Sequence, residues 1–332
     1  MNITNVKISV CIPVYGVEKY IERCARSLFE QTMTDGIEFI FVNDCTKDKS
    51  IEILEQVLSE YPQRKDQVKI IHHEKNGGLV AARNTGLKHA TGDYIIHCDS
   101  DDWVDLNMYE TMYNKAIETD ADMVYCDYYM SNETQNEHFR HLGTCEVTQL
   151  TDEMLYGNTM GSLGNKIFKR KIALQSDLYC PDHICMCEDL LRVVQMLTKC
   201  KKIAYISEPY YFYRWNFSSI SRAILSADQF KNMCDTYDFF INNLSDSHKK
   251  TTEYLQCLKL VFMIQMPGEM KTEDFIYQTR QLGRDKIKAA LPSLCRSRRV
   301  LLKIAFINYP LARFIYRVTR PVKLFIAKTT KK

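Results

Sequence analysis

The sequence predicts an α/β fold with a mostly parallel central sheet flanked by helices, followed by a helical C-terminal region. Short apolar runs alternate with amphipathic stretches through the first half of the chain, the pattern of a parallel sheet covered on both faces. Glycine contributes 12 of the 332 residues, which disfavours a loop-built architecture. Hydrophobic residues make up 45% of the chain and charged residues 26%, so a largely disordered chain is excluded.

The predicted elements follow one another in regular order. The first apolar run ends at Pro13, as a short buried strand can. Strands are predicted over residues 7–12, 37–42, 68–72, 93–98 and 122–127. The intervening helices, recognised by apolar residues at helical spacing, are predicted over residues 18–31, 50–61, 78–90 and 106–119.

The alternation ends near residue 130, and domain boundaries beyond it are less distinct. Helices are predicted over residues 151–157 and 187–197, an extended aromatic segment over 205–213, and one or two amphipathic helices over 228–266. We therefore expect an α/β domain over residues 1–225, a helical region over 226–297 and a basic amphipathic tail over 298–332.

The charge of the chain is distributed unevenly. Thirteen Lys and Arg residues and no acidic residue follow Asp285, whereas the rest of the chain carries 31 basic and 41 acidic residues. In the tail, the longest uncharged run, residues 304–312, is too short to span a membrane. Pro310 and Pro321 are expected to interrupt the tail. The tail is predicted to lie on an anionic membrane surface; the alternative is that it packs on the acidic body. It is too apolar for a nucleic-acid-binding arm.

The thirteen cysteines form no repeating frame, and the first residues lack the pattern of a secretory signal. Reduced thiols in the cytoplasm are the expectation, with the protein peripheral on the inner face of the cell membrane. Four candidate metal ligands with no zinc-type spacing are not expected to form a metal site: Cys180, His183, Cys185 and Cys187.

Ligands of parallel α/β sheets bind beyond the carboxyl ends of the strands. The segment Pro13, Val14, Tyr15 after the first strand lacks the glycine-rich turn of dinucleotide folds, which disfavours a hydride-transfer enzyme. Tyr15 can stack on a base or simply pack at the strand end. Asp44, after the second strand, can accept a hydrogen bond from a nucleobase or cap the next helix. Arg83, on the third helix, can reach a diphosphate or lie at the surface.

The strongest signal follows the fourth strand, where Asp99, Asp101 and Asp102 place three carboxylates within four positions. Such carboxylates repel one another, and a divalent cation such as Mg²⁺ or Mn²⁺ relieves that repulsion. A purely structural acidic turn, with Asp102 capping the next helix, explains one of the three acids. Glu188 and Asp189 precede an apolar helix, where acids are favoured by the helix dipole or can act as a general base.

Taken together, five motifs resemble the inverting family 2 glycosyltransferases with the GT-A fold, of the bacterial polysaccharide-biosynthesis type. The resemblance covers about residues 5–225 and is strong to residue 127. The motifs occupy residues 9–15, 42–46, 76–84, 92–95 and 99–102. One such motif is weakly specific, whereas five in the same order are specific.

The resemblance implies a metal-dependent transferase that moves a sugar from a nucleotide-diphosphate donor, with UDP-sugars favoured, to a hydroxyl of a glycan or lipid-linked glycan. It implies Asp189 as the catalytic base with Glu188 beside it, Asp101 and Asp99 as ligands of Mn²⁺ or Mg²⁺, and Lys166 on the acceptor side. The donor-binding residues that it implies are Pro13, Val14, Tyr15, Asp44, Arg83, Asp99, Ser100, Arg214, Ser219 and Ser221.

Two other functions remain open at this level. A sugar nucleotidyltransferase needs a glycine-rich first loop with a basic residue, which residues 13–16 do not supply. A non-catalytic module that binds sugar nucleotides is disfavoured by the presence of Asp101 and Asp189. Hydrolysis of the donor is expected only as a side reaction of a transferase.

Overall fold

The computed structural model describes residues 6–132, 134–175, 187–215, 226–265 and 271–329. The chain divides into two compact units, residues 1–218 and 219–332, and each unit is considered separately. The division falls a few residues before the expected end of the α/β domain.

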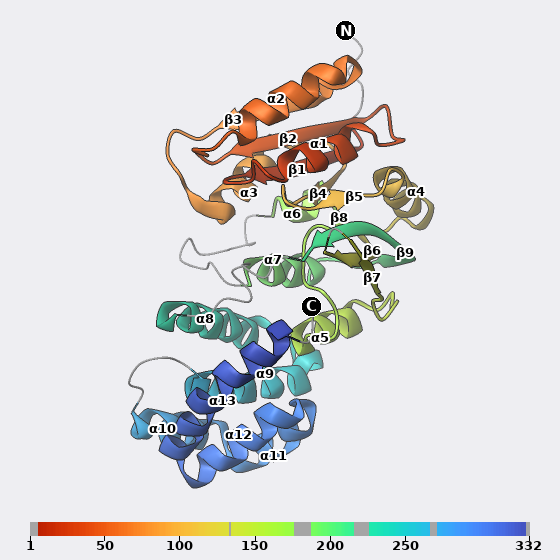
Figure 1. Cartoon of the computed structure of the whole chain (residues 1–332). Coiled ribbons are helices and arrows are strands. Elements are labelled where there is room, and N and C mark those ends of the chain that lie inside the picture. Colours follow the sequence, from red (N-terminus) through yellow and green to blue (C-terminus); the bar gives the residue numbers. More distant parts are fainter. Residues whose placement is uncertain (1–5, 133, 176–186, 216–225, 266–270, 330–332) are drawn as a thin grey trace. The chain divides into compact units, whose positions relative to one another are not determined.

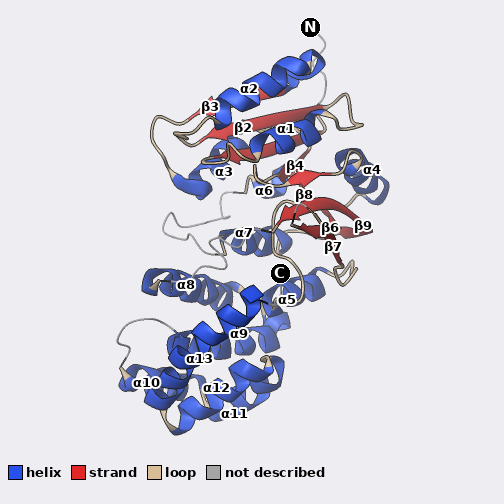
Figure 2. Cartoon of the chain, in the orientation of Figure 1, coloured by secondary structure: helices blue, strands red, loops and turns tan. Residues whose placement is uncertain are grey.

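The first unit is built on one mixed sheet, drawn in red in Figure 2. The strand order among the described residues is β3-β2-β1-β4-β8-β6-β9-β5, with β7 paired to β6. Strands β1, β2, β3, β4, β6 and β9 all run in the same direction. Strands β5, β7 and β8 run in the opposite direction and pair antiparallel with their neighbours. The strands are β1 (Ile8–Val14), β2 (Ile37–Asn43), β3 (Val68–His72), β4 (Tyr94–His97), β5 (Trp103–Val104), β6 (Met123–Ser131), β7 (Asn136–Phe139), β8 (Lys166–Lys169) and β9 (Ile203–Arg214).

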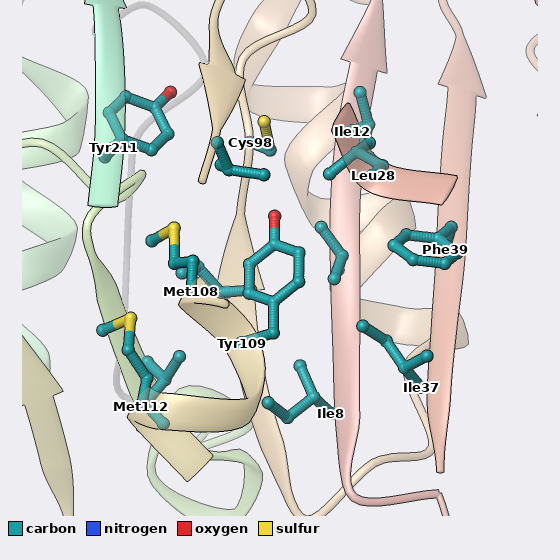
Figure 3. Packing of buried hydrophobic residues seen from close by; sticks show 14 of the residues in the cluster. Ile8, Ile12, Leu28, Ile37, Phe39, Cys98, Met108, Tyr109, Met112 and Tyr211 are labelled. Atoms are coloured by element: carbon teal, nitrogen blue, oxygen red, sulfur yellow. The ribbon is translucent and has the colours of Figure 1, made fainter. Parts of the chain in front are cut away.

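Helices cover both faces of this sheet because its central strands are apolar on both sides. Along β1, Ile8, Val10 and Ile12 belong to one buried cluster, and Cys11 belongs to another. The first cluster includes side chains of α1 (Ile21–Phe29), α2 (Ser50–Glu60) and α4 (Met108–Thr119), and Figure 3 shows part of it. The second includes side chains of α3 (Gly78–His89), α5 (Val147–Tyr156), α6 (Arg170–Ala173) and α7 (Glu188–Leu197).

The expected α/β class is therefore confirmed, and all five predicted strands of the first half are present as β1, β2, β3, β4 and β6. Periodicity did not identify the antiparallel strand β8, which separates β4 from β6. The strand is four residues long and its sequence, Lys-Ile-Phe-Lys, is too short to show a clear alternation.

The second unit is helical. It contains α8 (Ala227–Asn243), α9 (Lys249–Gln265), α10 (Thr272–Leu282), α11 (Arg284–Ala290), α12 (Arg296–Ile307) and α13 (Tyr309–Thr329). Helices α12 and α13 pack against α9 and bury Leu302, Ala305 and Ala312. No helix in the described part of the chain is long and apolar enough to cross a membrane.

One expectation for the tail is wrong. Pro321 was expected to interrupt the segment, but α13 continues through it. A proline inside a helix removes one backbone hydrogen bond and strains the preceding turn, which is a local cost that a 21-residue helix can tolerate. Pro310 lies in the first turn of α13, where its missing N–H costs nothing. Helix α12 ends just before it, and Asn308 separates the two helices.

Candidate active site

Strand β4 is a central strand of the sheet. Beyond its carboxyl end lie residues 99–102, here called the acidic turn. Asp102 is buried there, and its two carboxylate oxygens accept hydrogen bonds from the Tyr211 hydroxyl at 2.5 Å and the Arg214 backbone N–H at 2.7 Å. Burial raises the pKa of Asp102 well above its ordinary value, and the charges of Asp101 and Asp99 add to the effect. Asp102 therefore fastens the acidic turn to β9 and presents no free oxygen to a ligand.

Ser100 fastens the other side of the acidic turn. Its hydroxyl is buried and donates a hydrogen bond of 2.7 Å to the carbonyl oxygen of Pro13, at the end of β1. Ser100 and Pro13, both predicted to bind the donor, thus lie at adjacent strand ends. With Asp102 and Ser100 anchored, Asp99 and Asp101 are the partly exposed carboxylates of the turn.

Arg83 gathers carboxylates that are distant in the sequence. Its guanidinium donates to Asp99 at 2.8 Å and to Glu188 at 2.6 Å, and it also contacts Asp189. The Arg83 side chain is only 1% exposed. Burial disfavours the cation, but the charges of Asp189, Asp99 and Glu188 outweigh burial and raise the pKa of Arg83. The lone-surface-arginine interpretation of Arg83 is therefore wrong.

Helix α7 begins at this contact. Cys187 precedes it with a φ of +62°, a left-handed conformation that turns the chain into the helix. Glu188 and Asp189 form the first turn, where the helix dipole favours acids. Burial raises the pKa of Asp189 to about 8; Arg83 opposes the shift, and the carboxylate of Glu188 adds to it. An acid with that pKa changes its charge near neutral pH, which suits a general base.

A second arginine faces the acidic turn. Arg214, the last residue of β9, donates to Asp101 at 2.8 Å, and its guanidinium lies 3.7 Å from the ring centre of Tyr20. Burial raises the pKa of Asp101, the charge of Asp99 adds to the effect, and Arg214 opposes it. The predicted donor residue Arg214 and the predicted metal ligand Asp101 are thus in direct contact.

The residues predicted for the nucleotide lie at the ends of β1 and β2. Tyr15 follows β1 and is 54% exposed, so its ring is accessible for stacking, whereas Val14 is buried. Asp44 follows β2, is buried, and accepts 2.8 Å hydrogen bonds from the backbone N–H groups of Gly77 and Gly78. Its carboxylate holds the start of α3, and its predicted contact with a nucleobase stays a prediction.

The predicted acceptor residue Lys166 is fully buried. Its ammonium donates to the carbonyl oxygens of Met160 and Ser162 at 2.9 and 2.7 Å, and to the side chain of Asn165 at 2.7 Å. Burial lowers its pKa to about 7, which the charges of Cys126 and Asp189 oppose. Lys166 therefore shapes the loop that precedes β8.

Several predicted residues lie outside the described residues: Ser219, Ser221, Cys180, His183 and Cys185. Sequence reasoning missed Tyr211 and Tyr20, because neither belongs to a motif and each acts through a partner distant in the sequence. It also missed His97, the last residue of β4, whose pKa burial lowers well below the ordinary value, aided by Arg83 and Arg192.

The acidic turn offers carboxylate oxygens that can be compared with the ligands of a divalent cation. Among the described residues, no group of three or more His, Cys, Asp or Glu side chains is arranged to hold a metal ion. Mg²⁺-type sites in nucleotide enzymes need only one or two carboxylates, with substrate phosphates and water completing the shell. Asp101 and Asp99 are hard oxygen donors, partly exposed and mutually repelling, so they fit such a site.

The family model "Glycosyl transferase family 2" matches residues 9–176, which include most of β1, the acidic turn and β8. The chain belongs to glycosyltransferase family 2. Its curated relatives include the uncharacterised glycosyltransferase EpsJ of Bacillus subtilis, 32% identical over 221 residues that cover 64% of this chain and 62% of EpsJ. The match thus spans less than two thirds of that relative.

Two solved structures resemble this family 2 glycosyltransferase across 95% of its length. S. aureus TarS 1–349 in complex with UDP has a TM-score of 0.68 at 22% identity, with 91% of that chain covered. The mannosyltransferase PcManGT of Pyrobaculum calidifontis, in complex with GDP-Man and Mn²⁺, has a TM-score of 0.56 at 13% identity, with 87% covered. These likenesses establish the fold, and the expected GT-A class is confirmed.

Proposed function

We propose that this family 2 glycosyltransferase moves a sugar from a UDP-sugar to a hydroxyl of a glycan or lipid-linked glycan, with inversion at the anomeric carbon. One observation carries the proposal. Arg83 brings Asp189 of α7 beside Asp99 of the acidic turn, although about ninety residues separate them in the sequence. A candidate base and a candidate donor site therefore lie on either side of one buried guanidinium.

In the proposed reaction, the Asp189 carboxylate takes the proton of the acceptor hydroxyl. The acceptor oxygen forms a bond to the anomeric carbon while the bond from that carbon to the diphosphate oxygen breaks. The nucleotide diphosphate leaves with the bonding electron pair. One displacement inverts the configuration and needs no carboxylate nucleophile. The raised pKa of Asp189, about 8, makes its carboxylate a stronger proton acceptor than an ordinary aspartate.

The donor is proposed to lie across the ends of β1, β2 and β4. Tyr15 supplies an exposed ring for the base, and Arg214 at the acidic turn supplies a cation for the diphosphate. A UDP donor is favoured by the TarS structures in complex with UDP and UDP-GlcNAc. Asp101 with Asp99 would hold Mn²⁺ or Mg²⁺, the former present in the PcManGT complex. When bound, the cation offsets negative charge on the departing diphosphate.

The site of action is proposed to be the cytoplasmic face of the cell membrane. Helices α12 and α13 carry the basic, apolar tail, with one face packed on α9 and several large apolar side chains exposed. A peripheral membrane position would bring the protein to a lipid-linked acceptor.

A donor panel tests the proposal. The protein is incubated with Mn²⁺ and separate UDP-, GDP- and dTDP-sugars, with and without membrane lipid extract, and released nucleotide diphosphate is quantified. We expect release from a UDP-sugar that is lost with EDTA and in the Asp101→Asn and Asp189→Asn variants. The exposed Asp66, on the 3₁₀ turn after α2, provides the matched control Asp66→Asn, which should retain activity.

The variants also separate binding from turnover. Asp189→Asn should still bind UDP, because the base contacts the acceptor and not the nucleotide. UDP binding without turnover in the wild type, with any donor and extract, would support a binding module instead. Full activity of Asp189→Asn would remove Asp189 from the role of base.

A further inference from the structure

The helical second unit contains a pocket of about 720 Å³, a volume typical of small-ligand sites. Its wall combines apolar side chains with cations and contains no carboxylate. Helices α10, α11 and α12, with the residue that follows each of the first two, supply the lining residues Phe275, Ile276, Thr279, Arg280, Gly283, Arg284, Ile287, Lys288, Leu291, Ala305 and Phe306. Figure 1 shows these helices in blue within the second unit.

The apolar wall is anchored by aromatic rings. Phe275 is buried and stacks on Tyr309 with ring centres 4.5 Å apart, and it also contacts the ring of Phe306 at 6.1 Å. Gly283 joins α10 to α11 with a φ of +82°, a conformation that favours glycine. Two rigid helices thus meet at the pocket through a short turn, with buried rings on one wall.

The cations of the pocket have no anionic partner within the described part of the chain. Arg280, Arg284 and Lys288 recur every four residues, all exposed, and no ion pair joins them to a described carboxylate. The acids on the same helices, Glu273, Asp274 and Asp285, do not line the pocket. The lining therefore favours an occupant that carries negative charge.

Exposed apolar side chains also occur beside the pocket in the chain and on α13. Ile276 and Phe306 line the pocket and are themselves partly exposed, and Ile307, next in the chain, is 90% exposed. On α13, exposed large side chains recur at Leu311, Phe314 and Val318, a spacing that places them on one helix face. Exposed apolar residues gathered beside cations mark a surface that meets another apolar phase.

We propose that this pocket binds an anionic phospholipid of a membrane surface. The headgroup phosphate lies at Arg280, Arg284 and Lys288, and the upper part of an acyl chain lies against Ile276 and Phe306. Charge complementarity selects the occupant, since the pocket is lined by Arg280, Arg284 and Lys288 and by no carboxylate, and the chain that follows Asp285 carries thirteen Lys and Arg residues and no acid. The inference places the anion-recognising groups on α10 and α11, before the basic tail. It is independent of the transfer reaction, because vesicle binding needs no sugar donor.

Vesicle flotation of the full chain tests the proposal. The protein is mixed with vesicles of phosphatidylcholine alone or of phosphatidylcholine with phosphatidylglycerol, at about 0.1 M salt, where surface charges still act over about 10 Å. We expect binding only to the anionic vesicles. The triple variant Arg280→Gln, Arg284→Gln, Lys288→Gln should bind on the order of 100-fold more weakly, about fivefold for each cation removed.

A matched control removes the same charge elsewhere in the same unit. Lys231, Lys249 and Lys250 are exposed, lie on α8 and α9, and do not line the pocket. Replacing all three by Gln should weaken binding by no more than about threefold, since they lie outside the lipid site. Ile276→Gln keeps every charge and should also weaken binding, which net charge alone does not predict. Thermal unfolding of each variant checks that the helical unit is intact.

Three results would overturn the proposal. Equal losses in the two triple variants would show that overall charge, not the pocket, drives binding. Equal binding to neutral and anionic vesicles would remove the role of the cations. The third result is that the protein binds neither kind of vesicle, while inorganic phosphate raises the melting temperature of the wild type but not of the pocket variant. That result would identify a site for soluble phosphate. Sedimentation of the protein without vesicles measures its oligomeric state, and a dimer that the pocket variants disrupt would identify a second copy of the chain as the occupant instead.

Discussion

Replacing Arg83 by glutamine removes the cation that joins the acidic turn to α7. Three carboxylates, those of Asp99, Glu188 and Asp189, then share a largely buried space without their guanidinium. Breaking a buried ion pair by removing one partner costs about 3–5 kcal/mol. The side chains of Asp99 and Asp189 are 30% and 24% exposed, so water relieves part of this cost. We therefore expect a loss of about 3 kcal/mol in the free energy of unfolding.

The loss should depend on pH. Asp189 already has a pKa of about 8, against 3.8 for an ordinary aspartate, so the folded protein binds more protons than the unfolded chain between these values. Stability from this group is present below pH 4 and is lost as the pH rises through about 8. Without Arg83 the pKa of Asp189 rises further. The variant should therefore keep losing stability above pH 8, where the wild type has levelled off.

Urea unfolding at pH 6.5 and pH 9 measures both effects. With a slope of about 2–3 kcal/mol per molar urea, a loss of about 3 kcal/mol moves the midpoint by roughly 1 M. Arg26 provides the control, because it also bridges two carboxylates, Glu22 and Glu60, but at the surface. Arg26→Gln should move the midpoint far less, since exposed ion pairs contribute little. A midpoint shift for Arg83→Gln no larger than that for Arg26→Gln, or equal losses at both pH values, would refute the reasoning.

Three further predictions concern single side chains. Burial lowers the pKa of Lys166 to about 7 from 10.5, so the wild type should gain stability as the pH rises through this interval, and Lys166→Met should abolish that gain in urea titrations. In Gly164→Ala, the new methyl group would overlap the ring of Tyr211, which holds Asp102, so thermal unfolding should show a loss of about 1–3 kcal/mol. Tyr15→Ala should leave stability within about 0.5 kcal/mol but weaken UDP binding by about 5- to 150-fold in calorimetry if the ring stacks on the base.

Most strands of the first half could be predicted because they are apolar over most of their length. Every residue of β1 and every residue of β2 except Asn43 is buried, so a mainly hydrophobic run in the sequence predicts each strand. The extended segment predicted over residues 205–213 is part of β9, whose burial pattern alternates irregularly and whose β-bulge faces Asp127 and Tyr128 of β6. Its pairing to β6 joins segments about eighty residues apart, which local periodicity does not encode.

The sequence predicts which residues belong to the candidate site but not which of them contact one another. Motif spacing identified Asp99, Asp101 and Asp189 as functional candidates, yet it did not indicate that Arg83 contacts two of them. Ser100 is predicted to bind the donor, and Asp102 to be one of the metal-attracting carboxylates or a helix cap, whereas the structure shows both anchoring the acidic turn. Such roles depend on partners from β1 and β9, so they follow from sheet order rather than from sequence spacing.

The pKa shifts of Asp101 and Asp189 differ from those expected in a structural ion-pair network. In a structural network each buried acid is matched by a cation, and its pKa falls. Here Asp101 and Asp189 each contact an arginine, yet burial and neighbouring carboxylates still raise the pKa of both. The site therefore gathers more carboxyl groups than cations, and protonation of Asp101 and Asp189 is more favoured than that of an ordinary aspartate. Perturbed carboxyl groups of this kind cluster at functional sites, which agrees with the proposal of a cation at Asp101 and a transferred proton at Asp189.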